Sequence, residues 1–243
     1  MKRFLLLLPL GLLLVSCQAG AVGAGTSPTP AAVPSGSAHS LSLHGVDGVD
    51  LRVPAELYLA SGATERLTTS AAPAVLAKLR ATVQGSVLRL SLANGASIST
   101  NQPIVYHLTL PRVSSIAVEG AGLLQAASPA GGHVRLQLDG AARADIQNLR
   151  ASDLTAQLTG ASSVSLTGST STEEVQMSGA GDYRADTLDA EQVNISLSGA
   201  GACRVRADRS LDVTINGLGK VTYAGHPASV QRHVSGLGSI TAE

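Results

Sequence analysis

Apolar and polar residues alternate through the second half of this chain, and a glycine interrupts the alternation at nearly constant intervals. Residues 193–205 show the pattern: Val193, Ile195 and Leu197 alternate with polar residues, Ser-Gly-Ala-Gly follows, and the alternation resumes with Cys203 and Val205. A two-residue period places successive side chains on opposite faces of a strand. Each run therefore predicts a β-strand with one buried and one exposed face.

The interrupting glycines, which we name the corner glycines, recur seven times. They are Gly120, Gly140, Gly160, Gly179, Gly199, Gly217 and Gly236, at spacings of 20, 20, 19, 20, 18 and 19 residues. The residue two positions before each one is apolar: Val118, Leu138, Leu158, Met177, Leu197, Ile215 and Val234. Glycine supplies positive φ or close backbone approach at a tight corner. In a helix each glycine would cost about 1 kcal/mol, which together with the two-residue period excludes helices here.

A period of this length, repeated in register, is typical of a solenoid, because one repeat cannot bury its own apolar face. The sequence thus predicts an all-β fold, a parallel β-helix of about seven coils of about 20 residues with Gly-x-Gly corners. We expect residues 111–243 to form these repeats, with Leu197 pointing inward and Ser196 outward. The second corner glycine is replaced in Gly140-Ala141-Ala142 and Gly160-Ala161-Ser162, so those corners are expected to differ in shape.

Residues 39–110 are rich in strand patterns but less regular, and we expect them to cap the solenoid. Residues 73–79 predict one short helical piece. Residues 82–90 predict a hairpin that turns at Gly85-Ser86. Residues 104–110 predict a strand that ends at Pro111.

The N-terminus has the features of a bacterial lipoprotein. Lys2 and Arg3 precede an apolar run, which makes residues 1–16 an export signal too short for a comfortable membrane span. Leu14-Val15-Ser16-Cys17 resembles a lipobox, so Cys17 is expected to carry diacylglycerol; the alternative is an ordinary secretory signal with an incidental cysteine. Residues 17–38 are then the lipidated cysteine and a flexible tether rich in Gly, Ala, Ser and Pro. Resemblance to such lipoproteins, with Gln18 after the cysteine, implies the outer membrane or cell surface.

Composition argues against nucleic acid as a partner. Without Lys2 and Arg3 the chain keeps 15 basic residues against 17 acidic ones, and no basic stripe is present. Outside the export signal the aromatic residues are four tyrosines, which weakens both base stacking and aromatic sugar-binding faces.

The chain resembles the bacterial family called the putative auto-transporter adhesin head GIN domain. The resemblance rests on Leu57-Tyr58-Leu59, the segment from Ala81 to Leu90, Leu108-Thr109-Leu110-Pro111, the segment from Ile116 to Gly122, and the serial corner glycines. It extends over roughly residues 40–243. The resemblance implies a β-helix similar to pectin-lyase-type solenoids but without their catalytic residues, and a role in adhesion inferred from architecture.

Charged residues follow two neighbouring corners, and we name them the charged cluster. They are Asp182, Arg184, Asp186, Arg204, Arg206 and Asp208. Arg184 and Arg204 lie five residues after a corner glycine, so they should stack outward on adjacent coils, and Asp186 and Arg206 share the offset of seven. A solvated face with weak charge pairs is the favoured interpretation. A glycan or anion contact and a catalytic site are the alternatives.

No cofactor or metal site is predicted. The Gly-Ala-Gly-Asp phrase lacks the nine-residue period of calcium-binding β-rolls, and the six histidines have no zinc-ligand spacing. Cys203 takes an inward offset and should be a buried thiol without an intrachain partner.

Three functions remain open. The first is a non-enzymatic, surface-anchored β-helix for adhesion or envelope contacts with protein or glycan. The second is a β-helix carbohydrate-active enzyme, and the third is an envelope accessory that binds another protein through a solenoid face. Converging carboxylates in a cleft would favour the second, whereas a flat face of Ser, Thr and Asn favours the other two.

Overall fold

The computed structural model describes residues 37–243, so the expected export signal, Cys17 and most of the tether lie outside the described residues. The strands are β1 (Ser37–Ser42), β2 (Gly48–Leu51), β3 (Glu56–Ser61), β4 (Arg66–Ala71), β5 (Leu79–Gln84), β6 (Val87–Leu92), β7 (Val105–Leu110), β8 (Ser115–Gly120), β9 (Leu123–Ala127), β10 (Ala130–Gly140), β11 (Arg143–Gly160), β12 (Ser163–Gly179), β13 (Asp182–Gly199), β14 (Ala202–Gly217), β15 (Lys220–Ala224), β16 (Ser229–Gly236) and β17 (Ser239–Ala242). A short helix, α1 (Pro73–Leu76), lies between β4 and β5. Within residues 37–243, no helix has the length and apolar character needed to cross a membrane.

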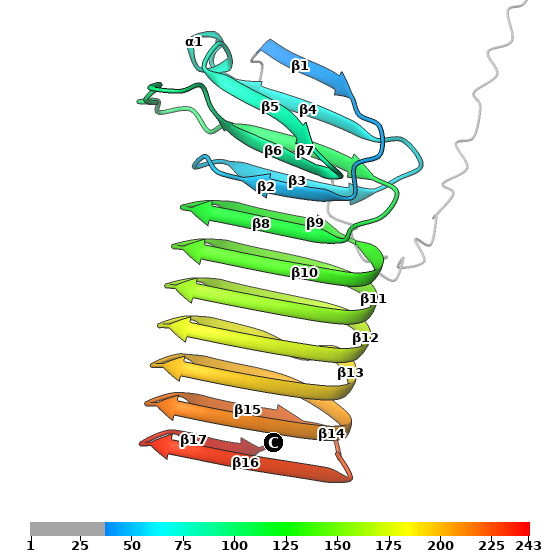
Figure 1. Ribbon diagram of the computed structural model, residues 1–243, viewed down its shortest axis with the longest axis vertical. Coiled ribbons are helices and arrows are strands. Elements are labelled where there is room, and N and C mark those ends of the chain that lie inside the picture. The colour runs from blue at the N-terminus through cyan, green and yellow to red at the C-terminus, as the bar shows by residue number, and fades with distance from the viewer. Residues whose placement is uncertain (1–36) are drawn as a thin grey trace, which may run out of the picture. The chain divides into compact units, whose positions relative to one another are not determined.

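From β8 to β17 the chain winds into a stack of coils joined by parallel ladders (Figure 1). Each coil has a pre-corner face, the strand segment that ends at a corner glycine, and a post-corner face, the segment that follows it. On the pre-corner face Met177 pairs with Leu197 and Leu197 with Ile215; on the post-corner face Tyr183 pairs with Cys203. The predicted all-β parallel solenoid is confirmed.

The alternation along each strand separates the core from solvent as expected. At six of the seven corners the apolar residue two positions before the glycine is almost completely buried: Val118, Leu138, Leu158, Met177, Leu197 and Ile215 are all 0–2% exposed, whereas Val234 of the terminal coil is 44% exposed. Their neighbours Ser196 and Ser198 are exposed. Because parallel strands stack in register, each inward residue touches its equivalents above and below, and one continuous apolar core runs along the solenoid.

The corner glycines are required by both backbone conformation and stacking. All seven have positive φ, from +90° at Gly120 to +141° at Gly217. At six of them a side chain would also run into the glycine of the preceding coil; at Gly160 a Cβ would lie 2.7 Å from the carbonyl oxygen of Gly140. The second corner position lacks the positive φ of the first, and Ala142 and Ser162, both 2% exposed, replace glycine there.

The N-terminal part of the stack does not follow chain order. Strand β2 pairs with β6 on one side and with β8 on the other, and β3 pairs likewise with β7 and β9. The coil made by β2 and β3 therefore lies between the later β6–β7 pair and the β8–β9 coil (Figure 1). Ion pairs connect this coil to both neighbours: Oδ2 of Asp50 lies 3.0 Å from Nε of Arg89 in β6, and Nη2 of Arg52 lies 2.9 Å from Oε1 of Glu119 in β8.

Antiparallel strands cover the N-terminal end of the stack. Strand β4 pairs antiparallel with β7 and β1, while β5 pairs antiparallel with β6. The β5–β6 pair is the predicted hairpin with Gly85-Ser86 at its turn, α1 falls within the predicted helical piece, and β7 ends immediately before Pro111. These three local predictions are confirmed.

The opposite end of the stack has an unpaired edge. Within residues 37–243, β16 and β17 pair with β14 and β15, respectively, and have no partner on their other side. Leu218, Val234 and Leu237 of the terminal coils are 64%, 44% and 85% exposed. This edge therefore presents free backbone groups and apolar side chains together.

Candidate functional site

The charged cluster lies on the outward side of β13 and β14. Arg184 and Arg204 are direct register partners in the parallel ladder, and both are exposed. The expected outward stacking of these two arginines is confirmed. Arg184 forms an ion pair with Asp182, two residues earlier on the same strand.

A register shift rearranges the rest of the cluster. The β13–β14 ladder is regular up to Ala185 opposite Val205 and then becomes irregular. Consequently Nε of Arg206 lies 3.2 Å from Oδ1 of Asp189 and 3.6 Å from Oδ1 of Asp208. Asp186, which shares the offset of Arg206 in the sequence, is exposed and is not its ion-pair partner in the structure.

The cluster has the properties of a solvated, mixed-charge face. Its ion pairs are exposed, and such pairs contribute between about 0 and 1 kcal/mol each to stability. Among the described residues, no group of three or more His, Cys, Asp and Glu side chains is arranged to hold a metal ion. What this face offers chemically is two exposed arginines on adjacent strands, with carboxylates nearby, suited to a polar or anionic surface contact.

A second group of polar residues, not predicted from the sequence, lies inside the solenoid. Glu173 is 0% exposed, and its Oε1 accepts a 2.6 Å hydrogen bond from the Tyr183 hydroxyl across the core. Its other oxygen has no hydrogen-bond partner among the described residues. Cys203, the register partner of Tyr183, is 1% exposed and is a free thiol, as predicted from its inward offset.

Burial sets the protonation of this interior group. Removal from water raises the pKa of Glu173 to about 7, although the Tyr183 hydrogen bond opposes the shift. Burial also raises the pKa values of Tyr183 and Cys203, which are thereby kept neutral. Glu173 is therefore the one member of the group that changes charge near neutral pH.

Glu173 should make the protein less stable as the pH rises. An unfolded glutamate has a pKa near 4.3, so folding favours the protonated form, and this contribution is complete below about pH 4 and lost as the pH rises through about 7. We expect Glu173→Gln to unfold at the same denaturant concentration as wild type near pH 4.5. At pH 8 it should be more stable by about 3 kcal/mol.

Denaturant unfolding at several pH values measures this difference directly. Glu174→Gln is the matched control, because it removes the same charge from the exposed neighbour on the same strand. A Glu173→Gln effect that is constant between pH 4.5 and pH 8 would contradict the assignment of a buried, titrating carboxyl group.

The sequence matches a known family profile, and the fold matches several solved structures. The sequence profile described as "Putative auto-transporter adhesin, head GIN domain" matches residues 46–227. No curated protein matches the sequence.

Several solved structures share the fold. A putative adhesin from Bacteroides fragilis superposes with a TM-score of 0.79 at 21% identity, over 86% of this chain and 99% of that one. A putative lipid binding protein from Parabacteroides distasonis gives a TM-score of 0.64 at 14% identity, over 86% and 98% of the two chains. A putative adhesin from Parabacteroides merdae gives 0.56 at 16% identity, over 85% and 95%. At these identities the likeness concerns the fold.

Proposed function

Because this chain belongs to the putative auto-transporter adhesin head GIN domain family, we propose that it is an exported, lipid-anchored protein of the cell envelope that makes adhesive contacts without enzymatic activity. The adhesin-like solenoid supplies the contact surface. In this proposal Cys17 carries the membrane lipid, and the partner is another envelope protein or a glycan. The outer membrane or cell surface is the proposed location.

The observation that carries the proposal is the repetitive polar surface of the stack. Outward positions on the pre-corner face of successive coils are Gln176, Ser196 and Thr214, followed by Ser178, Ser198 and Asn216 in the next outward row. Such rows form an extended face of small hydrogen-bonding groups, with the arginines of the charged cluster on the post-corner face. An extended face suits a broad contact with a protein or glycan better than the enclosed cleft typical of small-substrate enzymes.

The anchor is tested by metabolic labelling. We expect labelled palmitate to be incorporated into the wild-type protein and not into Cys17→Ala, because the Cys17 thiol is the attachment point. Globomycin treatment should leave the unprocessed form. Cys203→Ala is the control and should label as wild type does, since the Cys203 thiol is buried. Palmitate labelling that does not depend on Cys17 would contradict a lipid anchor at this residue.

The contact is tested by capture of partners from the protein's own envelope beside a glycan array. Binding that is reduced in the double variant Arg184→Ser/Arg204→Ser would support the charged cluster as part of the contact surface. The competing function, a β-helix polysaccharide lyase or hydrolase, predicts instead measurable turnover of a polyuronide or neutral glycan. Turnover that is lost in Asp182→Ala or Asp186→Ala would overturn the non-enzymatic proposal.

A further inference from the structure

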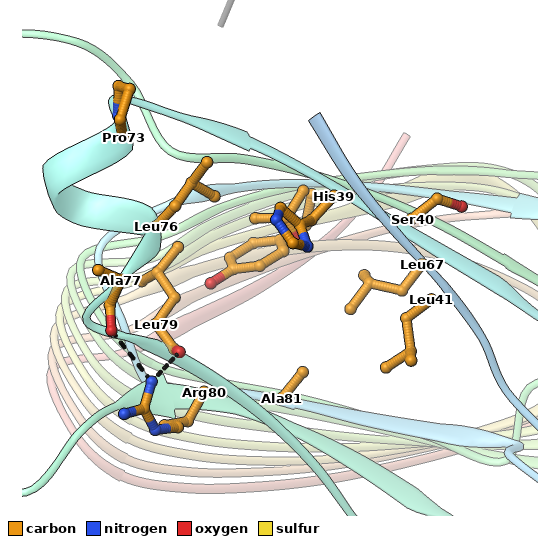
Figure 2. Close-up of a pocket in the computed structure, with 12 residues that line it drawn as sticks. His39, Ser40, Leu41, Leu67, Pro73, Leu76, Ala77, Leu79, Arg80 and Ala81 are labelled. Atoms are coloured by element: carbon orange, nitrogen blue, oxygen red, sulfur yellow. Dashed lines mark hydrogen bonds between the residues drawn. The ribbon is translucent and has the colours of Figure 1, made fainter. Parts of the chain in front are cut away.

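A cavity of about 590 Å³ lies among the antiparallel strands at the N-terminal end of the stack. Strands β1 and β4 form one wall, α1 and β5 form the other, and Tyr106 of β7 also lines the space. Figure 2 looks into this cavity, with the coils of the solenoid visible behind it. The volume lies within the range of about 300–1,000 Å³ that is usual for small-ligand sites.

The lining is mainly apolar. Leu41 and Leu67 face Leu76 and Leu79 across the space (Figure 2), and Pro73, Ala77 and Ala81 complete the apolar lining. Leu67 is 2% exposed and belongs to the solenoid core, whereas Leu41 is 46% exposed. The cavity therefore continues the apolar interior of the solenoid to the surface, and an apolar ligand would cover core surface that the antiparallel strands leave open.

Five polar side chains also line the cavity, those of His39, Ser40, Thr69, Arg80 and Tyr106, and two of them, Tyr106 and Arg80, indicate the kind of ligand. The Tyr106 side chain is 1% exposed, and its hydroxyl has no hydrogen-bond partner among the described residues. Burial raises the pKa of Tyr106, so this hydroxyl stays protonated and can donate a hydrogen bond. A buried hydroxyl without a partner is uncommon in native structures and points to a ligand or water as its partner.

Arg80 supplies a positive charge at the edge of the cavity. Its Nη1 donates hydrogen bonds to the carbonyl oxygens of Ala77 (3.1 Å) and Leu79 (2.9 Å), which hold the guanidinium at one edge of the cavity (Figure 2). Arg80 forms no ion pair with the described residues, and no Asp or Glu is among the residues that line the cavity. A fixed cation beside an apolar space, without a carboxylate to compensate it, favours an anionic head group.

We propose that this cavity binds a single-chain amphipathic anion, with its acyl chain among the leucines and its carboxylate or phosphate at Arg80. Long-chain fatty acids are the simplest ligands of this class. An uncharged chain of the same length would fill the apolar space equally but would gain nothing from Arg80. This site lies at the N-terminal end of the stack and is separate from the charged cluster on β13 and β14.

The test uses displacement of cis-parinaric acid, whose fluorescence rises in an apolar site. The full chain with Cys17→Ala serves as the reference protein, so that no acyl group at residue 17 competes for the cavity. Palmitate and lysophosphatidate are added separately to distinguish a carboxylate head from a phosphate head, and hexadecanol is the uncharged comparison. We expect saturable displacement by at least one anion, about tenfold tighter than by hexadecanol.

Two pairs of variants locate the site. Ala81→Phe fills the cavity and should abolish saturable binding, whereas Thr82→Phe, on the next residue of the same strand and outside the lining, should not. Arg80→Gln should remove the preference for the anions over hexadecanol, and Arg66→Gln, an exposed arginine outside the lining, should leave that preference intact.

Three outcomes would overturn the proposal. They are an absence of saturable binding in the reference protein, equal loss of binding in Ala81→Phe and Thr82→Phe, and an unchanged anion preference in Arg80→Gln. The anchor experiment on Cys17 and the capture experiment on the solenoid face are independent of all three.

Discussion

Leu197→Asp should lower the free energy of unfolding by several kcal/mol, whereas Ser196→Asp should change it by no more than about 0.5 kcal/mol. Leu197 is 0% exposed and lies between its register partners Met177 and Ile215. Aspartate at this position would bury a carboxylate that has no cation beside it. Ser196 is exposed and lies between Gln176 and Thr214, so a charge there stays in water.

The measurement is thermal and urea unfolding of the two variants beside wild type. The two positions are adjacent in sequence and lie on the same strand, so they share strand propensity and local backbone. Only the direction of the side chain differs between them. Equal destabilisation by both variants, or a larger effect of Ser196→Asp, would contradict the assignment of side chains to the core or to solvent. Because the coils stack in register, that contradiction would extend to the equivalent positions of the other coils.

Gly160→Ala should also be strongly destabilising, by about 3 kcal/mol or more. Gly160 has a φ of +91°, which side chains rarely adopt, and a Cβ there would lie 2.7 Å from the carbonyl oxygen of Gly140 in the preceding coil. The added methyl group would therefore strain the corner and push two coils apart.

A substitution at Gly120 separates the cost of positive φ from the cost of the close approach between coils. Its φ of +90° equals that of Gly160 within one degree, but a Cβ at Gly120 would meet nothing within 4 Å. Gly120→Ala should therefore show only the conformational cost of positive φ, about 1–2 kcal/mol. Gly132→Ala, with open space around it and no positive φ, should be close to neutral. If Gly120→Ala and Gly160→Ala destabilise equally, close stacking of the corners is not what requires glycine at Gly160.

The repeating part of the fold could be predicted from sequence because each coil repeats the same physical requirement. Burial of Met177, Leu197 and Ile215 in one ladder follows from their common position before a corner, and alternation assigns the faces without knowledge of distant contacts. The helix that begins at Pro73 and the hairpin at Gly85-Ser86 were predictable for a similar reason, since their determinants are local.

The insertion of β2 and β3 into the stack could not be predicted in the same way. The register of Leu51 with Val118 and of Glu56 with Leu123 places Val53-Pro54-Ala55 at the corner of this coil. That corner has no glycine, so the repeat is invisible in the sequence. The partner strand β8 also comes after more than 50 intervening residues, and no local pattern encodes such a pairing.

The interior carboxyl group and the cavity differ in how far the sequence reveals them. Glu173 lies six residues before a corner glycine, and the equivalent positions of other coils hold Leu154, Val193 and Leu211. A single charged residue at this otherwise apolar position indicates a buried polar group from the sequence alone. The cavity has no such sign, because its lining comes from β1, β4, α1, β5 and β7, which are brought together only by the fold. The exposure of Leu41 and the missing partner of Tyr106 become visible only in three dimensions.

In this fold, equivalent residues of successive coils lie one strand spacing apart, in register, on a continuous outer face. Cysteine pairs on that face test it directly. Ser178 and Ser198 are exposed register partners, and parallel neighbours about 4.8 Å apart fall within the Cα separations that a disulfide bridges. Asn216 is the register partner of Ser198 on the coil beyond, about twice as far from Ser178.

The measurement is disulfide formation under mild oxidation in the Cys17→Ala background, read by mass spectrometry after proteolysis. The double variant Ser178→Cys/Ser198→Cys should form an intrachain disulfide nearly completely, as should Ser198→Cys/Asn216→Cys. The pair Ser178→Cys/Asn216→Cys, which spans two coils, should remain reduced. Disulfide formation in the two-coil pair to the same extent, or its absence from both adjacent-coil pairs, would contradict the in-register solenoid.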